Sequence, residues 1–236
     1  MTPDRAMVMA AGKGVRMQPL THDRPKPLVD VGGKPLIDWA LDMLAAGHIE
    51  KSVVNLHHFG EMLKAHLKRR EGGPDILFSD ESDQLLETGG GVTKALPLLG
   101  DNPFFVVNAD GIWLDGNRSL DALAKAWRRD DMDALLLLVE HKDALFFEGA
   151  GDFLKDDNGR LARPPAGEGA PFIYCGIQLV SPALFTDTPD GPFSTNILWD
   201  RAIENGRLFG LVHPHPWLHV GTPQARDDAE AFLRHR

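Results

Sequence analysis

The first 141 residues alternate short apolar runs with amphipathic helical patterns, and few folds accommodate that order. The apolar runs have the length of strands, and the segments between them repeat apolar side chains at helical spacing. This alternation is typical of a parallel sheet that is covered by helices. The predicted strands are 6–11, 52–58, 75–80, 103–110 and 133–141. The predicted helices between them are 35–48, 60–71 and 119–131.

The second part of the chain has a different pattern. Two short strands are predicted around the Asp-Asn-Gly turn at 157–159, and a long apolar strand follows at 171–180. We therefore expect antiparallel strands to join the sheet in this part. Helices are predicted at 194–206 and 223–235, on either side of a last strand near 208–220. The predicted fold class is α/β with a mixed sheet.

Composition narrows the functional classes. With 236 residues, of which 43% are hydrophobic and 25% charged, the chain is predicted to form one globular domain over residues 1–236. A formal net charge of −9 argues against nucleic acid as a partner, although a local cationic pocket can still hold a small anion. Cys175, the one cysteine, cannot form an internal disulfide, and no apolar run reaches the length of a membrane span. We therefore expect a cytoplasmic protein with no membrane partner, as a monomer or small homo-oligomer.

A glycine loop with two nearby cations follows the first predicted strand. Small residues and glycines let the backbone approach a ligand closely, and amides exposed there suit phosphate. The spacing fits neither the P-loop nor the dinucleotide fingerprint, so an ordinary tight turn is the alternative. Arg16 and Lys26 can present two cations beside the loop, and the flanking prolines restrict the chain around Lys26. The loop residues predicted to bind the ligand are Ala10, Ala11, Gly12, Lys13 and Gly14.

This segment resembles the sugar-1-phosphate nucleotidylyltransferase family. The residues that carry the resemblance are AAGKGVRM at 10–17, PLT at 19–21 and PKPL at 25–28. It implies an enzyme that joins a nucleoside triphosphate to a sugar 1-phosphate and releases pyrophosphate. In the family, the arginine matching Arg16 neutralises the leaving pyrophosphate, and the lysine matching Lys26 contacts the reacting phosphates.

The resemblance also implies an architecture. The family fold is a Rossmann-like three-layer α/β/α mixed sheet of the nucleotide-diphospho-sugar transferase type. Residues 1–141 would then form mainly the nucleotide-binding half, and residues 142–236 mainly the sugar-binding half.

A polar pair ends the fourth predicted strand. Asn108 and Asp110 are expected at the carboxyl edge of a central parallel strand, where open α/β sheets bind ligands. Asp110 could instead cap the following loop. The resemblance matches Asp110 to a magnesium ligand, and a carboxylate suits Mg²⁺ well.

The family's second metal ligand is usually Asp or Asn, whereas the matching segment of this chain, WLHVGTP at 217–223, carries His219. Imidazole suits Mg²⁺ less well than a carboxylate. Three alternatives follow: His219 ligates a metal such as Mn²⁺, the site works with Asp110, water and substrate phosphates alone, or catalysis is impaired. We favour the second. The third would leave a non-catalytic nucleotide-sugar sensor.

The segment QLLETGGG at 84–91 is predicted to be a loop with free amides ahead of a helix. By the resemblance it matches the base-recognition loop, which assigns Gln84, Thr88 and Gly89 to the nucleotide. The ETGGG form, together with GDF at 151–153, most resembles the N-acetylmuramate-1-phosphate uridylyltransferases of cell-wall recycling. That narrower match implies UTP and N-acetylmuramate α-1-phosphate. A mannose or other hexose 1-phosphate with GTP or another triphosphate is the alternative.

The sugar pocket departs from a common family pattern. Members acting on glucose-type phosphates often carry Glu-Lys-Pro where this chain has ARP at 162–164. Loss of that carboxylate argues against a standard glucose-1-phosphate pocket, because sugar hydroxyls would be buried unpaired. Arg163 could pair with a phosphate or a lactyl carboxylate, or be solvent-exposed. Gly176 would clear space for the sugar ring, unless it marks a bulge. The other predicted sugar contacts are Asn108, Glu148 and Asn196.

Overall fold

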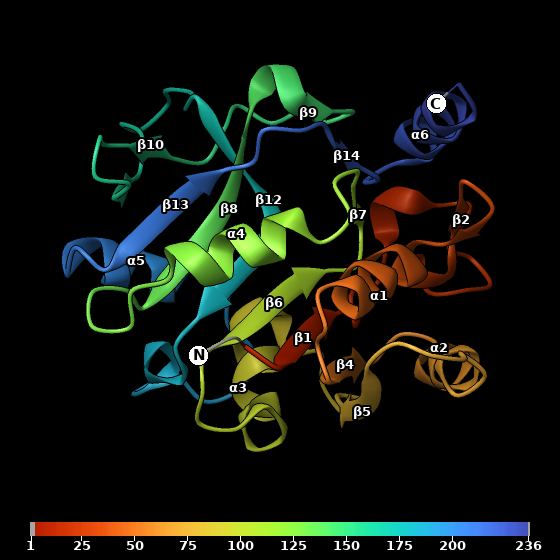
Figure 1. Ribbon diagram of the computed structural model, residues 1–236. Helices are drawn as coiled ribbons and strands as arrows, with labels where there is room; N and C mark the ends of the chain where they lie inside the picture. Colours follow the sequence, from red (N-terminus) through yellow and green to blue (C-terminus); the bar gives the residue numbers. More distant parts are fainter. Residues whose placement is uncertain (1–2, 236) are drawn as a thin grey trace.

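The computed structural model describes residues 3–235 and contains a central seven-stranded sheet. Its strands are β1 (Arg5–Met9), β4 (Lys51–Leu56), β5 (Asp75–Asp80), β6 (Phe104–Asn108), β8 (Ala134–Glu140), β12 (Phe172–Val180) and β13 (Leu208–Val212). Their spatial order is β13-β8-β12-β6-β1-β4-β5 (Figure 1). The five strands predicted in the first half of the chain all lie in this sheet.

The sheet is mixed, as predicted. Strand β1 pairs in parallel with β4 and β6, and β4 pairs in parallel with β5. Strand β12 runs antiparallel to both of its neighbours, β6 and β8, and β13 returns parallel to β8. The pairing register of β12 with β8 shifts between Tyr174 and Gln178, and Gly176 within that interval has a φ of 87°. Gly176 therefore marks a bulge, which was the alternative to a purely space-clearing role.

Helices cover both faces of the sheet. The helices are α1 (Leu36–Ala46), α2 (Gly60–Leu67), α3 (Glu87–Leu99), α4 (Arg118–Ala126), α5 (Asn196–Glu204) and α6 (Pro223–Arg234). Successive side chains of β1 point to opposite faces, so Ala6 and Val8 join the core under α1, α2 and α4, whereas Met7 joins the core under α3 and α5. The three-layer α/β/α prediction is confirmed. No helix within residues 3–235 is long and apolar enough to cross a bilayer.

A second, small sheet lies beyond the carboxyl end of β6. It contains β7 (Gly111–Trp113), β14 (Trp217–His219) and β9 (Ala144–Leu145), with β14 in the middle. The last predicted strand, 208–220, is therefore wrong as one element, because the proline-rich segment 213–216 separates β13 from β14. The amide of Val220 donates to the carbonyl of Asp110 at 3.0 Å, so this sheet holds β14 beside the end of β6.

Short elements complete the fold. The two-stranded ribbons are β2 (Asp30–Val31) with β3 (Lys34–Pro35), and β10 (Leu154–Lys155) with β11 (Leu161–Ala162). The second ribbon confirms the strand pair predicted around the Asp-Asn-Gly turn. The 3-10 helices are Val15–Met17, Lys26–Leu28, His141–Asp143 and Pro182–Phe185.

Candidate active site

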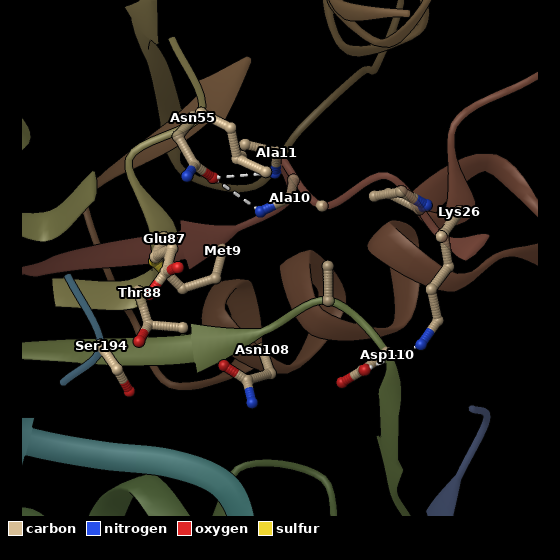
Figure 2. A pocket seen from close by; sticks show the side chains of 15 residues that line it. Met9, Ala10, Ala11, Lys26, Asn55, Glu87, Thr88, Asn108, Asp110 and Ser194 are labelled. Carbon is tan, nitrogen blue, oxygen red and sulfur yellow. Dashed lines mark hydrogen bonds and ion pairs between the residues drawn. The ribbon is translucent and has the colours of Figure 1, made fainter. Parts of the chain in front are cut away.

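A cavity of about 440 Å³ opens at the carboxyl ends of β1, β4 and β6 (Figure 2). Parallel strands present their carboxyl ends at one edge, which is where open α/β sheets bind ligands. The glycine loop, the Lys26 segment, the start of α3 and the end of β6 contribute to its walls. The predicted site residues that line it are Ala10, Ala11, Gly12, Gly14, Lys26, Thr88, Asn108 and Asp110.

The glycine loop spans residues 10–14, directly after β1. The amides of Ala10 and Ala11 donate to Oδ1 of Asn55 at 2.6 and 3.2 Å, so they are not available to a ligand. Among residues 3–235, the amides of residues 12–14 have no acceptor, which leaves them free to bind an anion. Gly14 has a φ of 63°, a left-handed conformation that favours glycine. Lys13 is exposed and does not line the cavity.

Lys26 and Asp110 form an ion pair in the cavity wall. Nζ of Lys26 lies 2.8 Å from Oδ2 of Asp110, and 29% of the Asp110 side chain remains exposed. Burial alone would raise the pKa of Asp110, but the positive charge of Lys26, with a smaller contribution from Arg16, holds that pKa below its ordinary value. Asp110 is therefore a carboxylate at neutral pH. The site combines a fixed negative charge with an adjacent cation.

His219 lies beside Asp110 because β14 pairs with β7. In that pairing His219 is opposite Gly111, the residue that follows Asp110. The imidazole stacks on the Trp217 ring with centroids 5.3 Å apart. Burial lowers the pKa of His219; Asp110 opposes this shift, and the cations Lys26 and Arg16 add to it. A neutral imidazole is therefore favoured at this position.

Arg16 and Glu148 line a neighbouring hollow of about 340 Å³, rather than the main cavity. His219 also lines this hollow and is not among the residues that line the main cavity. The charge of Arg16 still acts on Asp110, where it lowers the pKa of the carboxyl group. Arg16 therefore lies near enough to the ion pair to act on its charge, while Glu148 is separated from the other predicted sugar contacts.

A side pocket of about 220 Å³ adjoins the main cavity and shares with it Asn108, Thr88, Met9 and Ser194. Its inner wall contains Tyr174, Gln178 and Trp199. The indole of Trp199 donates to Oε1 of Gln178 at 3.0 Å, and the Tyr174 ring meets Trp199 edge-on at 4.9 Å.

The Tyr174 hydroxyl is buried and has no hydrogen-bond partner among residues 3–235. Burial raises the pKa of this phenol well above its ordinary value, so the hydroxyl stays protonated. It is thus a donor and acceptor without a partner, in a residue that lines the side pocket.

Arg163 is not free in solvent. Its Nε donates to Oδ1 of Asp200 at 2.8 Å, and Nη2 donates to Oδ1 of Asn196 at 2.9 Å. The guanidinium also lies 4.5 Å from the centroid of the Phe153 ring. Asn196, the first residue of α5, lines the side pocket and connects Arg163 to it.

The space beside Gly176 is occupied by a neighbouring side chain and is not open. A Cβ built there would lie 3.2 Å from Cβ of Asn108 and 3.4 Å from the Trp113 ring. The bulge therefore lets Asn108 pack directly against β12.

The prediction of a free loop over 84–91 is wrong. Helix α3 begins at Glu87 and includes all three glycines, and the amide of Gly89 donates to the carbonyl of Phe193 at 2.8 Å. A Cβ on Gly89 would lie 2.2 Å from the Phe193 ring, and one on Gly90 would lie 2.5 Å from a backbone carbonyl. Close packing against the 191–193 segment, rather than loop flexibility, requires these glycines. Gln84 is exposed and does not line the cavity, whereas Thr88 does.

Comparison with known proteins identifies the family. A protein-family model described as "Nucleotidyl transferase" matches residues 5–147. This range includes the glycine loop, Lys26 and Asp110. The chain belongs to the nucleotidyl transferase family. This nucleotidyltransferase is 47% identical to the N-acetylmuramate alpha-1-phosphate uridylyltransferase of Caulobacter vibrioides, over 98% of this chain and 97% of that protein. It is 35% identical to the enzyme of the same name from Neisseria meningitidis serogroup B, over 97% of each chain.

Solved structures share the fold of this nucleotidyltransferase. The inositol-1-phosphate CTP transferase from T. maritima superposes with a TM-score of 0.77 at 14% identity, covering 99% of this chain and 96% of that one. A UDP-glucose pyrophosphorylase solved with UDP-glucose gives a TM-score of 0.78 at 15% identity, covering 98% and 99%. The fold and family predicted from the sequence are confirmed, and the chain is a sugar-1-phosphate nucleotidyltransferase.

Enzymes of this family generally use a divalent metal. The residues of this nucleotidyltransferase offer such a metal few protein ligands. Asp110 offers carboxylate oxygen to the cavity, with the neutral imidazole of His219 beside it. No cluster of three or more His, Cys, Asp or Glu side chains within residues 3–235 could hold a metal ion. The site suits a hard cation that takes its other ligands from water and substrate phosphates, and it does not suit a closed protein cage.

Sequence reasoning missed two residues of this nucleotidyltransferase. Asn55 lines the cavity from β4, and buried Glu81 lies behind it at the end of β5. One signal was present: Asn55 interrupts an otherwise apolar strand run, and a polar residue at a buried strand position needs a partner. Nothing local identifies that partner, because the two residues are 26 positions apart.

Proposed function

We propose that this nucleotidyltransferase converts UTP and N-acetylmuramate α-1-phosphate to the nucleotide-sugar and pyrophosphate. The single observation that carries the substrate assignment is the 47% identity over 98% of the chain to a protein named for that reaction. The cavity supports it, because free loop amides, Lys26 and Asp110 occupy one wall. Since the reaction consumes a nucleoside triphosphate, we place the enzyme in the cytoplasm.

The chemistry requires charge control more than proton transfer. A phosphate oxygen of the sugar 1-phosphate attacks the α-phosphorus of UTP, the bond to the bridging oxygen breaks, and pyrophosphate leaves. The nucleophile is already ionised, so no general base is needed. The amides of residues 12–14, Lys26 and Arg16 bind and neutralise the phosphates, which is the main contribution a protein makes to such transfers.

We assign Mg²⁺ as the metal, held by Asp110, with His219 adjacent and Mn²⁺ as the alternative. The metal would supply charge neutralisation at the phosphates. Lys26 lies 2.8 Å from the same carboxylate and holds it in the cavity wall. The cation would then need no protein ligand besides Asp110, because Mg²⁺ usually keeps several waters and binds substrate phosphates.

The two halves of the chain divide the substrates in this proposal. Residues 1–141 bind mainly the nucleotide, with Thr88 at the base end, and residues 142–236 bind mainly the sugar. The side pocket beside Asn108 is lined by Tyr174 and Trp199, and these aromatic walls suit a sugar that carries an acyl substituent. Arg163 bonds Asn196, which lines that pocket, and Asp200, and we assign it to a lactyl carboxylate.

The test is pyrophosphate release with Mg²⁺ across four nucleoside triphosphates and a panel of sugar 1-phosphates. We expect release with UTP and N-acetylmuramate 1-phosphate, and much less with glucose 1-phosphate or with GTP and mannose 1-phosphate. A preference for the mannose pair would move the assignment to the hexose alternative. Tight binding of the nucleotide-sugar with no release, repeated with Mn²⁺ and folded protein, would identify a sensor instead.

A further inference from the structure

A buried polar pair lies behind the main cavity. Asn55 is 1% exposed and Glu81 is fully buried, and both lie where the adjacent parallel strands β4 and β5 end. Nδ2 of Asn55 donates to Oε1 of Glu81 at 2.7 Å. Burying a carboxylate is costly unless its oxygens accept hydrogen bonds. The pair therefore needs a reason beyond filling the core.

Each member of the pair holds a different wall of the cavity. Oδ1 of Asn55 accepts the amides of Ala10 and Ala11, where the glycine loop begins (Figure 2). Oε2 of Glu81 accepts the amide of Leu86 at 3.0 Å, immediately before α3. The start of α3 lines the same cavity as the glycine loop, through Glu87 and Thr88 (Figure 2). A continuous chain of hydrogen bonds thus joins the two walls through the interior.

The chain of hydrogen bonds has one direction. Both carboxyl oxygens of Glu81 accept, and the Asn55 amide has one accepting oxygen and one donating nitrogen. Three backbone amides and one side-chain amide are therefore all matched to acceptors, with no alternative arrangement of equal quality. Gly91 also supports this chain of hydrogen bonds, because a Cβ at that position would lie 2.9 Å from Oε1 of Glu81. Glycine at this helical position makes room for the carboxylate.

We propose that Asn55 and Glu81 are positioning residues that fix the distance between the glycine loop and the start of α3, so that the nucleotide cavity is formed before the triphosphate binds. The inference rests on the proposed use of this cavity for the nucleotide. Pre-organisation lowers the cost of ordering both walls on binding, so the pair acts on triphosphate affinity. Neither residue needs to change the affinity for the sugar 1-phosphate.

Exchanging the two functional groups tests the proposal. In N55D the new carboxylate faces Glu81, and in E81Q the new amide meets a donor on one side, so each single variant loses at least one bond of the chain. In N55D/E81Q the carboxylate at position 55 accepts from Ala10, Ala11 and the new amide, whose oxygen accepts from Leu86. Every hydrogen bond is then restored with the polarity of the central bond reversed.

Binding is measured by calorimetry with the triphosphate that the wild type binds most tightly, so the test does not depend on UTP being correct. We expect each single variant to bind it about tenfold more weakly or worse, because a buried polar group is left unsatisfied. The double variant should return to within about threefold of wild type, and KM for the sugar 1-phosphate should stay constant throughout. Val53→Ala, a buried apolar change in the same strand, controls for lost stability and should leave triphosphate affinity intact.

Three results would overturn the proposal: unchanged triphosphate affinity in both single variants, failure of the exchange to restore it in folded protein, or an equal loss in Val53→Ala at matched stability. A wild type that binds no triphosphate would instead refute the nucleotide assignment on which the proposal rests. The two failures are thus distinguishable in one set of titrations.

Discussion

Nζ of Lys26 lies 2.8 Å from Oδ2 of Asp110, across 84 positions of sequence. Pro25, in an extended conformation, precedes the short helix that begins at Lys26, and Asp110 follows the end of β6. The ion pair therefore joins the segment after the glycine loop to the carboxyl edge of the sheet. It also maintains Asp110 as a carboxylate facing the cavity.

Removing the cation should stop the reaction without unfolding the protein. We expect Lys26→Ala to lower kcat about 100-fold or more, because the proposal uses this charge to neutralise the reacting phosphates in a partly enclosed site. Pyrophosphate release measures kcat, and circular dichroism checks the fold. Lys68→Ala, which removes an exposed lysine, is the matched control and should keep full activity. Near-normal turnover in Lys26→Ala would remove this lysine from the catalytic group.

The contribution of His219 can be separated from that of Asp110 by metal titration. If Asp110, water and phosphates suffice, Asp110→Asn should lower kcat about 100-fold or more, while His219→Ala should cost less than about tenfold. His219→Asp should lower the Mg²⁺ concentration at half-maximal rate, since a second carboxylate suits this ion better. Equal losses in Asp110→Asn and His219→Ala would show instead that the imidazole is an essential ligand.

Tyr174→Phe should affect the sugar and leave the nucleotide alone. The hydroxyl has no partner within residues 3–235, so its removal should leave the melting temperature unchanged or slightly raised. If it bonds the sugar, KM for the sugar 1-phosphate should rise about five- to fifty-fold with KM for UTP unchanged. A fall in stability with normal kinetics would assign Tyr174 to the core instead.

The sequence predicts the layers well because they depend on local periodicity. The five strands of the first half and the helices between them repeat apolar residues at strand and helix spacing, so β1, β4 and β6 were predicted close to their bounds. The strands β7, β9 and β14 have two or three residues each and carry no periodic pattern. Their existence depends on pairing between distant segments.

Part of the site was predicted from the sequence. The glycine loop and Asp110 were predicted where apolar strand runs end, and Lys26 from its place beside the loop and from the family resemblance. The Asn55–Glu81 pair forms only when β4 and β5 align. The segment 84–91 was predicted to be a loop with free amides ahead of a helix, on its small residues. In the folded protein its glycines lie inside α3, where Gly89 packs against the Phe193 ring.

Acid should weaken the fold through His213. This buried histidine lies 2.8 Å from the hydroxyl of Ser119, and burial lowers its pKa below the ordinary 6.5, with Asp115 and Asp143 opposing the shift and His215 adding to it. The unfolded chain then takes up a proton below about pH 6.5 that the folded chain excludes, so the stability present above that pH is lost as the pH falls.

Urea unfolding between pH 8 and pH 5 measures this effect. The unfolding free energy should fall on acidification, with a contribution from His213 of at most about 1.4 kcal/mol per pH unit. His213→Gln should be less stable at pH 8 and show a flatter dependence below pH 6.5. The exposed-residue variant His22→Gln should keep the wild-type slope. An unchanged slope in His213→Gln would assign the acid sensitivity to other groups.

Two glycine-to-alanine changes should affect different properties, because their surroundings differ. One should lower stability, and the other should raise KM for UTP. A Cβ on Gly90 would lie 2.5 Å from the carbonyl of Gly191, so Gly90→Ala should destabilise the protein by about 1–3 kcal/mol. A Cβ on Gly12 meets nothing within 4 Å, so Gly12→Ala should fold normally. Its methyl group would nevertheless stand in the loop whose amides we propose bind the phosphates, and we expect KM for UTP to rise with the melting temperature unchanged. Normal KM in Gly12→Ala would mean that the triphosphate does not approach this loop closely.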